Sequence, residues 1–308
     1  MKKLLTLLAL TISFSINAQW YTNGTGIQSL SNDAIGSYSI SMGFDTTASG
    51  HSSTSMGIFT SASGYSSIAM GANTTASYFY STAMGYNTTA SGISSTSMGY
   101  ESIASADYST ATGRATTASG ANSTSMGHST TASGSNSTAM GRETTASDYA
   151  SLVIGQFNSS GSSATSATSF NTSNTAFVIG NGTDSSNKSD AFKVMFNGDT
   201  TVGGDITISS DARLKSNIVS LGSTLSKLLL IDGKSYEKDG KQRIGVLAQE
   251  IQEVFPELVI EDGNEMLAVN YQGLVPVLIN ALKEQDKIIK SQEERLTNIE
   301  KLIAKLND

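Results

Sequence analysis

The chain has 308 residues, a formal net charge of −7 and no cysteine. Its 19 Lys and Arg residues form no cluster of the kind that a phosphate backbone requires, which argues against nucleic acid as a partner. Small polar residues dominate between Trp20 and Ser209 and exclude a single large hydrophobic core, and without cysteine no disulfide stabilises the chain.

The first residues, MKKLLTLLALTISFSINAQW, have the layout of a secretory signal peptide. Two lysines precede an apolar stretch that ends near Phe14, and small or polar residues continue to Ala18, where we expect cleavage. A membrane anchor is the less favoured interpretation, because the stretch is shorter than the ~20 residues that span a bilayer. Residues 1–18 therefore predict secretion with no membrane span after signal removal, and residues 19–36 form an N-terminal segment.

Glycines recur at a constant interval, that of Gly43 to Gly57, as far as Gly155, and alanines keep the same period from Ala48 to Ala146. Such a period marks a repeat array. Each unit, for example STSMGHSTTASGSN, contains two short alternations: Thr or Ile two residues before Met, and Thr two residues before Ala. They predict two short strands per unit, with turns at the Gly and at the Ser-Gly. Low-complexity disorder is the alternative, but it does not require a regular glycine spacing.

The alternating side chains of each unit are expected to share the inward face of a stacked coil. This interpretation places Met98 inside and Tyr100 just beyond the turn glycine. One Met, one Ile or Thr and one Ala bury too little surface to offset the cost of ordering a whole unit, so we expect the coils to associate with other chains.

The motif of Ala or Ser, Met or Ile, and Gly, followed five residues later by Ala-Ser-Gly, resembles the head repeats of trimeric autotransporter adhesins over residues 37–158. The resemblance implies a left-handed parallel β-roll in a homotrimer of intertwined or abutting chains. It also implies adhesion to a host-cell, matrix or glycan surface, without identifying the ligand.

Residues 159–209 form a connector in which apolar residues alternate on each side of an Asn-Gly pair, Asn197 and Gly198. We predict a turn at this pair and β-strands that continue the fibre as a stalk. The alternating residues are Phe192, Val194 and Phe196, then Val202, Ile206 and Ile208.

Residues 210–308 predict an α+β domain. A helix is expected to end near Asp232, a strand to lead into a short helix stopped by Pro256, and a long helix to reach the end. The long helix carries heptads over about residues 278–306, which favour a coiled coil of three strands over a lone amphipathic helix, with two Gln layers fixing the register. The core positions are Leu282, Ile289, Leu296 and Ile303, and Leu278, Gln285, Gln292, Ile299 and Leu306.

The stretches SDARLKSNI, IGVLAQEIQEVFPELV and VNYQGLVPVLINALKEQ, followed by the coiled coil, resemble the C-terminal intramolecular chaperone domain of phage endosialidase tailspikes. That family has a self-cleaving Ser-Lys peptidase activity. The resemblance implies that Ser210 is the nucleophile, Lys215 its base, and the bond between Ser209 and Ser210 the cleavage site. A neutral lysine can activate a hydroxyl, and burial at a trimer interface favours the neutral form. Spacing alone is weak evidence, because a Ser followed by Asp also begins helices as an ordinary cap.

These features together predict a mainly β trimeric fibre with a C-terminal α+β chaperone domain that ends in a trimeric coiled coil. We expect a secreted or cell-surface adhesin-like fibre whose last domain assembles the trimer and then releases itself. The alternatives are a phage-derived or injection-machine tail fibre and a glycan-depolymerising tailspike enzyme. No cofactor and no external substrate are expected, and no metal site either, since His51 and His128 stand alone in variable repeat positions.

Overall fold

The computed structural model describes residues 20–22, 27–29, 35–238, 240–261 and 263–307, and the predicted signal peptide lies outside them. The chain divides into two compact units between Thr207 and Ile208.

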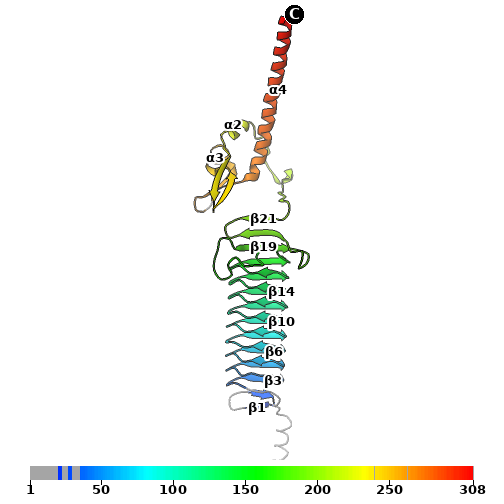
Figure 1. The fold of residues 1–308 in the computed structure, drawn as a ribbon, viewed down its shortest axis with the longest axis vertical. Coiled ribbons are helices and arrows are strands. Elements are labelled where there is room, and N and C mark those ends of the chain that lie inside the picture. The colour runs from blue at the N-terminus through cyan, green and yellow to red at the C-terminus, as the bar shows by residue number, and fades with distance from the viewer. Residues whose placement is uncertain (1–19, 23–26, 30–34, 239, 262, 308) are drawn as a thin grey trace, which may run out of the picture. The chain divides into compact units, whose positions relative to one another are not determined.

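The first unit is a β-solenoid, which we call the roll, with coils of equal length that stack in parallel register (Figure 1). Met98 and Gly99 pair with Met84 and Gly85 of the preceding coil. Each coil gives a five-residue strand to a long sheet, and most coils also give a two-residue strand to a short sheet. The strands of the long sheet within the roll are β3 (Ile40–Phe44), β4 (Thr54–Ile58), β6 (Ile68–Ala72), β8 (Thr82–Tyr86), β10 (Thr96–Tyr100), β12 (Thr110–Arg114), β14 (Thr124–His128), β16 (Thr138–Arg142) and β18 (Leu152–Gln156).

Further strands complete the first unit. At its start, β1 and β2 form an antiparallel pair, and β2 joins β3 in parallel. The short sheet consists of β5 (Ser61–Ala62), β7 (Thr75–Ala76), β9 (Thr89–Ala90), β11 (Ile103–Ala104), β13 (Thr117–Ala118), β15 (Thr131–Ala132) and β17 (Thr145–Ala146). The terminal strands are β1 (Trp20–Thr22), β2 (Ile27–Ser29), β19 (Thr175–Asn181), β20 (Asp190–Met195) and β21 (Thr200–Val202).

Small side chains fill the interior of the roll. In one coil they are Ser95, Ser97, Ser102 and Ala104, all fully buried, and the other coils between β3 and β17 carry Ser, Thr or Ala at the same positions. None of these inward positions holds a side chain larger than Thr. The prediction that Met98 lies inside is therefore wrong: its neighbour Ser97 points inward, and Met98 lies on the outer face of the long sheet, partly exposed.

The glycine column is a consequence of close stacking. Gly99 lies inside β10 at φ +114°, and a Cβ there would overlap the carbonyl oxygen of Gly113 in the next coil. The prediction that this glycine forms a turn is therefore wrong, because it lies within a strand. The left-handed turn residues of this coil are Ser94 and Glu101, at φ 51° and 54°.

Interior hydroxyls form hydrogen bonds within a coil. Ser55 Oγ lies 2.7 Å from Thr60 Oγ1 and donates to the Thr60 carbonyl at 3.0 Å. One coil later Ala69 takes the place of the serine, and the buried Thr74 hydroxyl has no partner among the described residues. The repeat thus tolerates an unpaired hydroxyl where alanine replaces serine.

The connector closes the end of the roll. β19 runs parallel to β18, and β20 and β21 add antiparallel strands. The predicted turn at Asn197 and Gly198 is present, and the Gly198 amide donates to the Met195 carbonyl at 2.9 Å. Ile206 and Ile208 were expected in a strand, but pairing ends at Val202 because two glycines follow and weaken the strand.

The second unit is a small α+β domain. Ile251, Phe255, Leu258 and Val277 form its buried core. The predicted helix before Asp232 ends earlier, at Leu228, because the chain then turns to place Ile231 against this core. Its elements are η1 (Ala212–Leu214), α2 (Leu225–Leu228), β22 (Lys234–Lys238), β23 (Lys241–Gly245), α3 (Ala248–Val254), η2 (Pro256–Leu258), β24 (Val259–Glu261), β25 (Leu267–Val269), η3 (Tyr271–Gly273) and α4 (Leu274–Asn307).

The long helix α4 has two regions. Val277 and Ala281 near its start are buried against the domain core, and the remainder extends beyond it. Along that remainder the predicted heptad positions Leu282, Leu296 and Ile303 are exposed in the single chain. The apolar stripe therefore has no partner within the described part of one chain.

Replacing Ala69 with Ser should stabilise the roll by about 1 kcal/mol, because the new hydroxyl can pair with Thr74 as Ser55 pairs with Thr60. Urea unfolding of the full chain measures the change. Ala76→Ser is the matched control, since it adds a hydroxyl at a buried position of the alanine column, and it should destabilise. Equal effects of both substitutions would contradict the proposed pairing.

Candidate functional site

A single 3-10 turn positions the predicted Ser-Lys pair. Asp211 caps η1 by accepting a hydrogen bond from the Arg213 amide at 2.9 Å. At the other end of the turn, the Lys215 amide donates to the Ala212 carbonyl at 3.1 Å. The turn therefore brings residue 215 back toward residue 210, and the capping residue is Asp211 rather than Ser210.

The two predicted site residues are in contact. Lys215 Nζ donates a hydrogen bond to Ser210 Oγ at 2.6 Å. This distance allows direct proton transfer between a hydroxyl and an amine. The arrangement can supply an activated oxygen nucleophile, and Ser209 immediately precedes it in the chain.

Asp211 and Arg213 form an ion pair beside this contact. The Arg213 guanidinium donates to both carboxylate oxygens of Asp211, at 3.0 and 2.7 Å, and holds the pKa of Asp211 below its ordinary value. Because the Asp211 carboxylate is paired with Arg213, the Lys215 side chain contacts Ser210 instead of Asp211. Sequence reasoning missed the ion pair, although an Asp and an Arg two residues apart within the motif are a visible signal.

The site is open to water in a single chain. Residues 201–223 are all exposed. A lysine amine becomes neutral more readily when it is buried. The described residues of one chain supply no such cover for Lys215.

A second polar cluster, which sequence reasoning missed, connects α2 to α4. Glu284 accepts hydrogen bonds from the Thr224 amide at 2.6 Å and from the Ser223 hydroxyl at 2.7 Å. The Thr224 amide, followed by the Ser223 hydroxyl, lowers the pKa of Glu284. The pairs are about 60 residues apart in the chain, so no local motif reveals them. The one sequence signal for these contacts is the short helix α2, whose first backbone amides need a hydrogen-bond acceptor.

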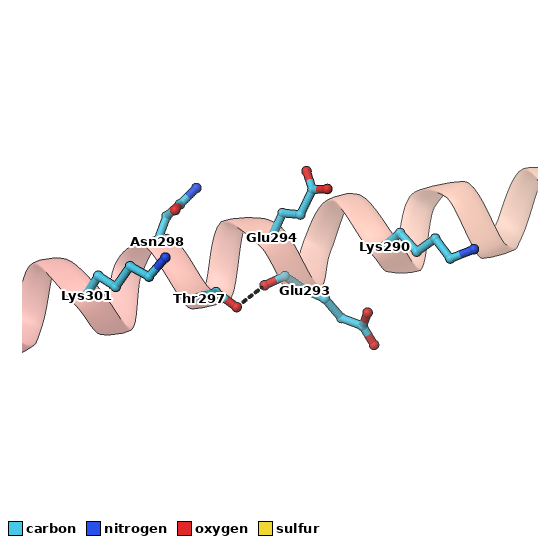
Figure 2. A pocket seen from close by; sticks show the side chains of 6 residues that line it. All are labelled: Lys290, Glu293, Glu294, Thr297, Asn298 and Lys301. Carbon is cyan, nitrogen blue, oxygen red and sulfur yellow. Dashed lines mark hydrogen bonds between the residues drawn. The ribbon is translucent and has the colours of Figure 1, made fainter.

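Two surface hollows among the described residues of the second unit lie apart from the Ser-Lys pair. One, of about 490 Å³, is lined by Tyr236, Leu247, Met266 and Tyr271 among others. The other, of about 520 Å³, lies along α4, where Thr297 donates to the Glu293 carbonyl at 2.9 Å (Figure 2). Its polar residues occupy heptad positions other than the apolar stripe, so they mark the outer face of the helix.

The described segments hold neither a candidate membrane span nor a cluster of metal ligands. None of their helices is both long enough and apolar enough to cross a bilayer. Nowhere in those segments do three or more His, Asp or Glu side chains converge as metal ligands. His51 instead stacks on Tyr65, with ring centroids 4.9 Å apart.

Two family models match the chain. The family described as chaperone of endosialidase matches residues 210–260, a segment that includes Ser210 and Lys215. The YadA head domain repeat matches residues 34–60, 62–88, 79–102, 90–116, 118–144 and 132–158.

Curated relatives include long tail fibre proteins Gp37 of phages. Those of Enterobacteria phages K3 and T2 are each 34% identical over 103 residues, and that of Escherichia phage AR1 is 33% identical over 92 residues. The matches cover 30%, 30% and 26% of this chain. The chain spans about 8% of the length of these relatives.

These matches confirm the predicted architecture of adhesin-type head repeats followed by a chaperone segment. The mainly β fold, with a solenoid and a long C-terminal helix, is confirmed as well. The catalytic roles of Ser210 and Lys215 and the cleavage at Ser209 stay predictions.

The connection between Glu284 and α2 should weaken in acid. Because the pKa of Glu284 is lowered in the folded chain, its contribution to stability is complete above the unfolded value, about 4.3. It is lost as the pH falls through the lower folded value. Hydrogen exchange at the Thr224 amide, corrected for intrinsic pH dependence, should therefore accelerate in this range.

Glu284→Gln should remove this pH dependence. Glu294→Gln, on the exposed polar face of the same helix, should retain it. If the Glu284 variant kept the wild-type pH profile, another group would be responsible.

Proposed function

We propose that the protein is a secreted, homotrimeric, adhesin-like fibre whose C-terminal domain assembles the trimer and then cuts the chain between Ser209 and Ser210. The contact of 2.6 Å between Lys215 Nζ and Ser210 Oγ, within the segment that matches the chaperone of endosialidase, carries the proposal. The match to head repeats supports the adhesive role of the roll.

Two apolar surfaces without partners support a trimer. The outer face of the long sheet carries a row of methionines with exposed members such as Met126 and Met140. The stripe on α4 is also exposed. Association of three chains would bury both surfaces. The methionine row crosses successive strands of the long sheet, and the heptads run along α4.

The C-terminal domain sets the register of assembly. The coils of three identical chains can pair out of step, because each coil presents nearly the same edge as the next. A coiled coil has one preferred alignment, which polar layers such as Gln285 and Gln292 help to fix. If α4 trimerises first, the coils of the three rolls begin to pair in the correct register.

Cleavage proceeds by an N-to-O acyl shift. Neutral Lys215 takes the proton of the Ser210 hydroxyl, and Oγ attacks the carbonyl carbon of Ser209. The C–N bond breaks, the proton passes to the nitrogen of Ser210, and an ester joins the two residues. Water then hydrolyses the ester, leaving a carboxylate on Ser209 and restoring the Ser210 hydroxyl. A neighbouring chain that covers Lys215 in the trimer favours its neutral form.

A phage-derived or injection-machine tail fibre is the second candidate function. The similarity to phage long tail fibre proteins favours it. The two candidates share the trimer and the chaperone, and they differ in location: a cell surface or surrounding medium for the adhesin, a phage or injection particle for the tail fibre. Surface labelling of cells compared with purified particles distinguishes them.

Full-length protein expressed without residues 1–18 should separate on a denaturing gel into two pieces, the smaller comprising residues 210–308. Ser210→Ala and Lys215→Ala should each leave one uncut band that still sediments as a trimer, because they remove the nucleophile or its base and not the coiled coil. Ser209→Ala is the control and should still be cut. An intact wild type would reduce the domain to a chaperone without peptidase activity.

Met98→Asp should weaken the trimer, because it places a charge in the row of methionines, while each chain keeps its coils. Sedimentation at micromolar concentration measures association, and circular dichroism measures the β content. Tyr100→Asp, at the end of the same strand, should have a smaller effect. A wild-type protein that sediments as a monomer would falsify the trimer itself.

A further inference from the structure

Six rings lie together on the turns that connect the short sheet to the long sheet and on the turn before β3. We call them the aromatic corner. Each ring contacts a neighbour, so the set is continuous over four successive turns. Its members are Tyr38, His51, Tyr65, Tyr78, Phe79 and Tyr80.

The rings follow the stacking of the coils. His51 and Tyr65 are parallel, at an interplanar angle of 1° and a centroid distance of 4.9 Å. Tyr65 meets Phe79 at 6.3 Å and Tyr80 at 5.9 Å, both edge to face. Rings on successive turns thus lie 4.9 to 6.3 Å apart, and the closest pair has the spacing of strands in a sheet, 4.7–4.9 Å.

Packing within the chain does not explain these rings. Tyr78 occupies a position that is glycine in the coils before and after it, Gly64 and Gly92, yet its ring is exposed. Tyr80 has a left-handed backbone at φ 58°, which is unfavourable for a bulky residue and which Ser66 and Ser94 adopt in the adjacent coils. The roll imposes this backbone on every coil, so the exposed ring at Tyr80 adds bulk to a turn that Ser66 and Ser94 form without it.

The chemistry of the corner is apolar and uncharged. All six residues are exposed, and none of the four tyrosine hydroxyls has a hydrogen-bond partner in the described part of the chain. No Lys or Arg occurs from residue 19 to residue 113. An anionic ligand would find no Lys or Arg there, whereas ring faces and free hydroxyls suit a ligand with C–H faces and hydroxyls of its own.

We propose that the aromatic corner binds an uncharged polysaccharide, an inference that rests on the adhesive function proposed above. Pyranose rings present C–H faces to aromatic rings and hydroxyls to the tyrosine hydroxyls. A row of rings that extends over four successive turns can contact several units of a polymer at once, which favours a glycan over a small molecule. The corner lies on the turns and not on the methionine face assigned to chain contacts.

The test uses full-length protein on immobilised uncharged polysaccharides, namely an α-glucan, a β-glucan and a galactomannan, with hyaluronan and polysialic acid as anionic probes. Wild type should bind at least one uncharged polymer and neither anionic one. Tyr80→Ala should weaken binding about tenfold or more, as expected for an aromatic anchor.

Tyr108→Ala is the matched control. Tyr108 has the same turn position, the same exposure of 58% and the same φ of 58° as Tyr80, but it lies outside the aromatic corner. This variant should bind as wild type does. Binding to anionic polymers only, binding to a protein only, no binding, or equal losses in both variants would overturn the inference.

Sedimentation of the same samples separates the two proposals. A trimer that binds no uncharged polymer contradicts the inference and leaves the proposed fibre intact. A monomer contradicts the proposed function itself.

Discussion

The narrow interior of the roll is the constraint on which the rest of the molecule depends. Successive coils hydrogen-bond in parallel register, and from β3 to β17 the inward positions hold only Ser, Thr and Ala. A backbone this tight also requires the glycine column, because a Cβ at Gly99 would meet the next coil. Methionine, tyrosine and phenylalanine are therefore displaced to the outside. The chain obtains little hydrophobic stabilisation from its own interior and depends on backbone hydrogen bonds and on partners.

Because the large side chains lie outside the roll, three parts of the chain differ in character. The outer face of the long sheet carries an apolar row, the turns carry exposed aromatic side chains, and the second unit has a conventional core around Ile251 and Phe255. Repeats that are nearly interchangeable do not fix one alignment between chains, and the proposed assembly assigns that role to the heptads of α4. Glu284 joins that helix to the segment at Thr224, downstream of Ser210.

The sequence predicted the repeat, the strands and the long helix because these follow from periodicity. Alternation identifies the two faces of a strand without saying which face is inside. The inward face is the one with the small side chains, so Ser97 is buried in the roll and Met98 lies on the outer face. The strand predicted at Ile206 is absent, because two glycines follow Val202 and the last strand ends there. The approach of Lys215 to Ser210 was predictable from a spacing of five residues and a resemblance. The Glu284 contacts were not, because their partners are about 60 residues apart.

The register of the roll has an evolutionary consequence. Every coil begins and ends in the same geometry, so unequal recombination between repeats that inserts or deletes one whole coil leaves both neighbours able to stack. Each such event changes the length of the solenoid by one strand spacing, about 4.8 Å. Natural variants can therefore differ in reach by whole coils while their ends are unchanged. Length becomes a trait that selection can adjust in steps, independently of the chemistry displayed along the turns.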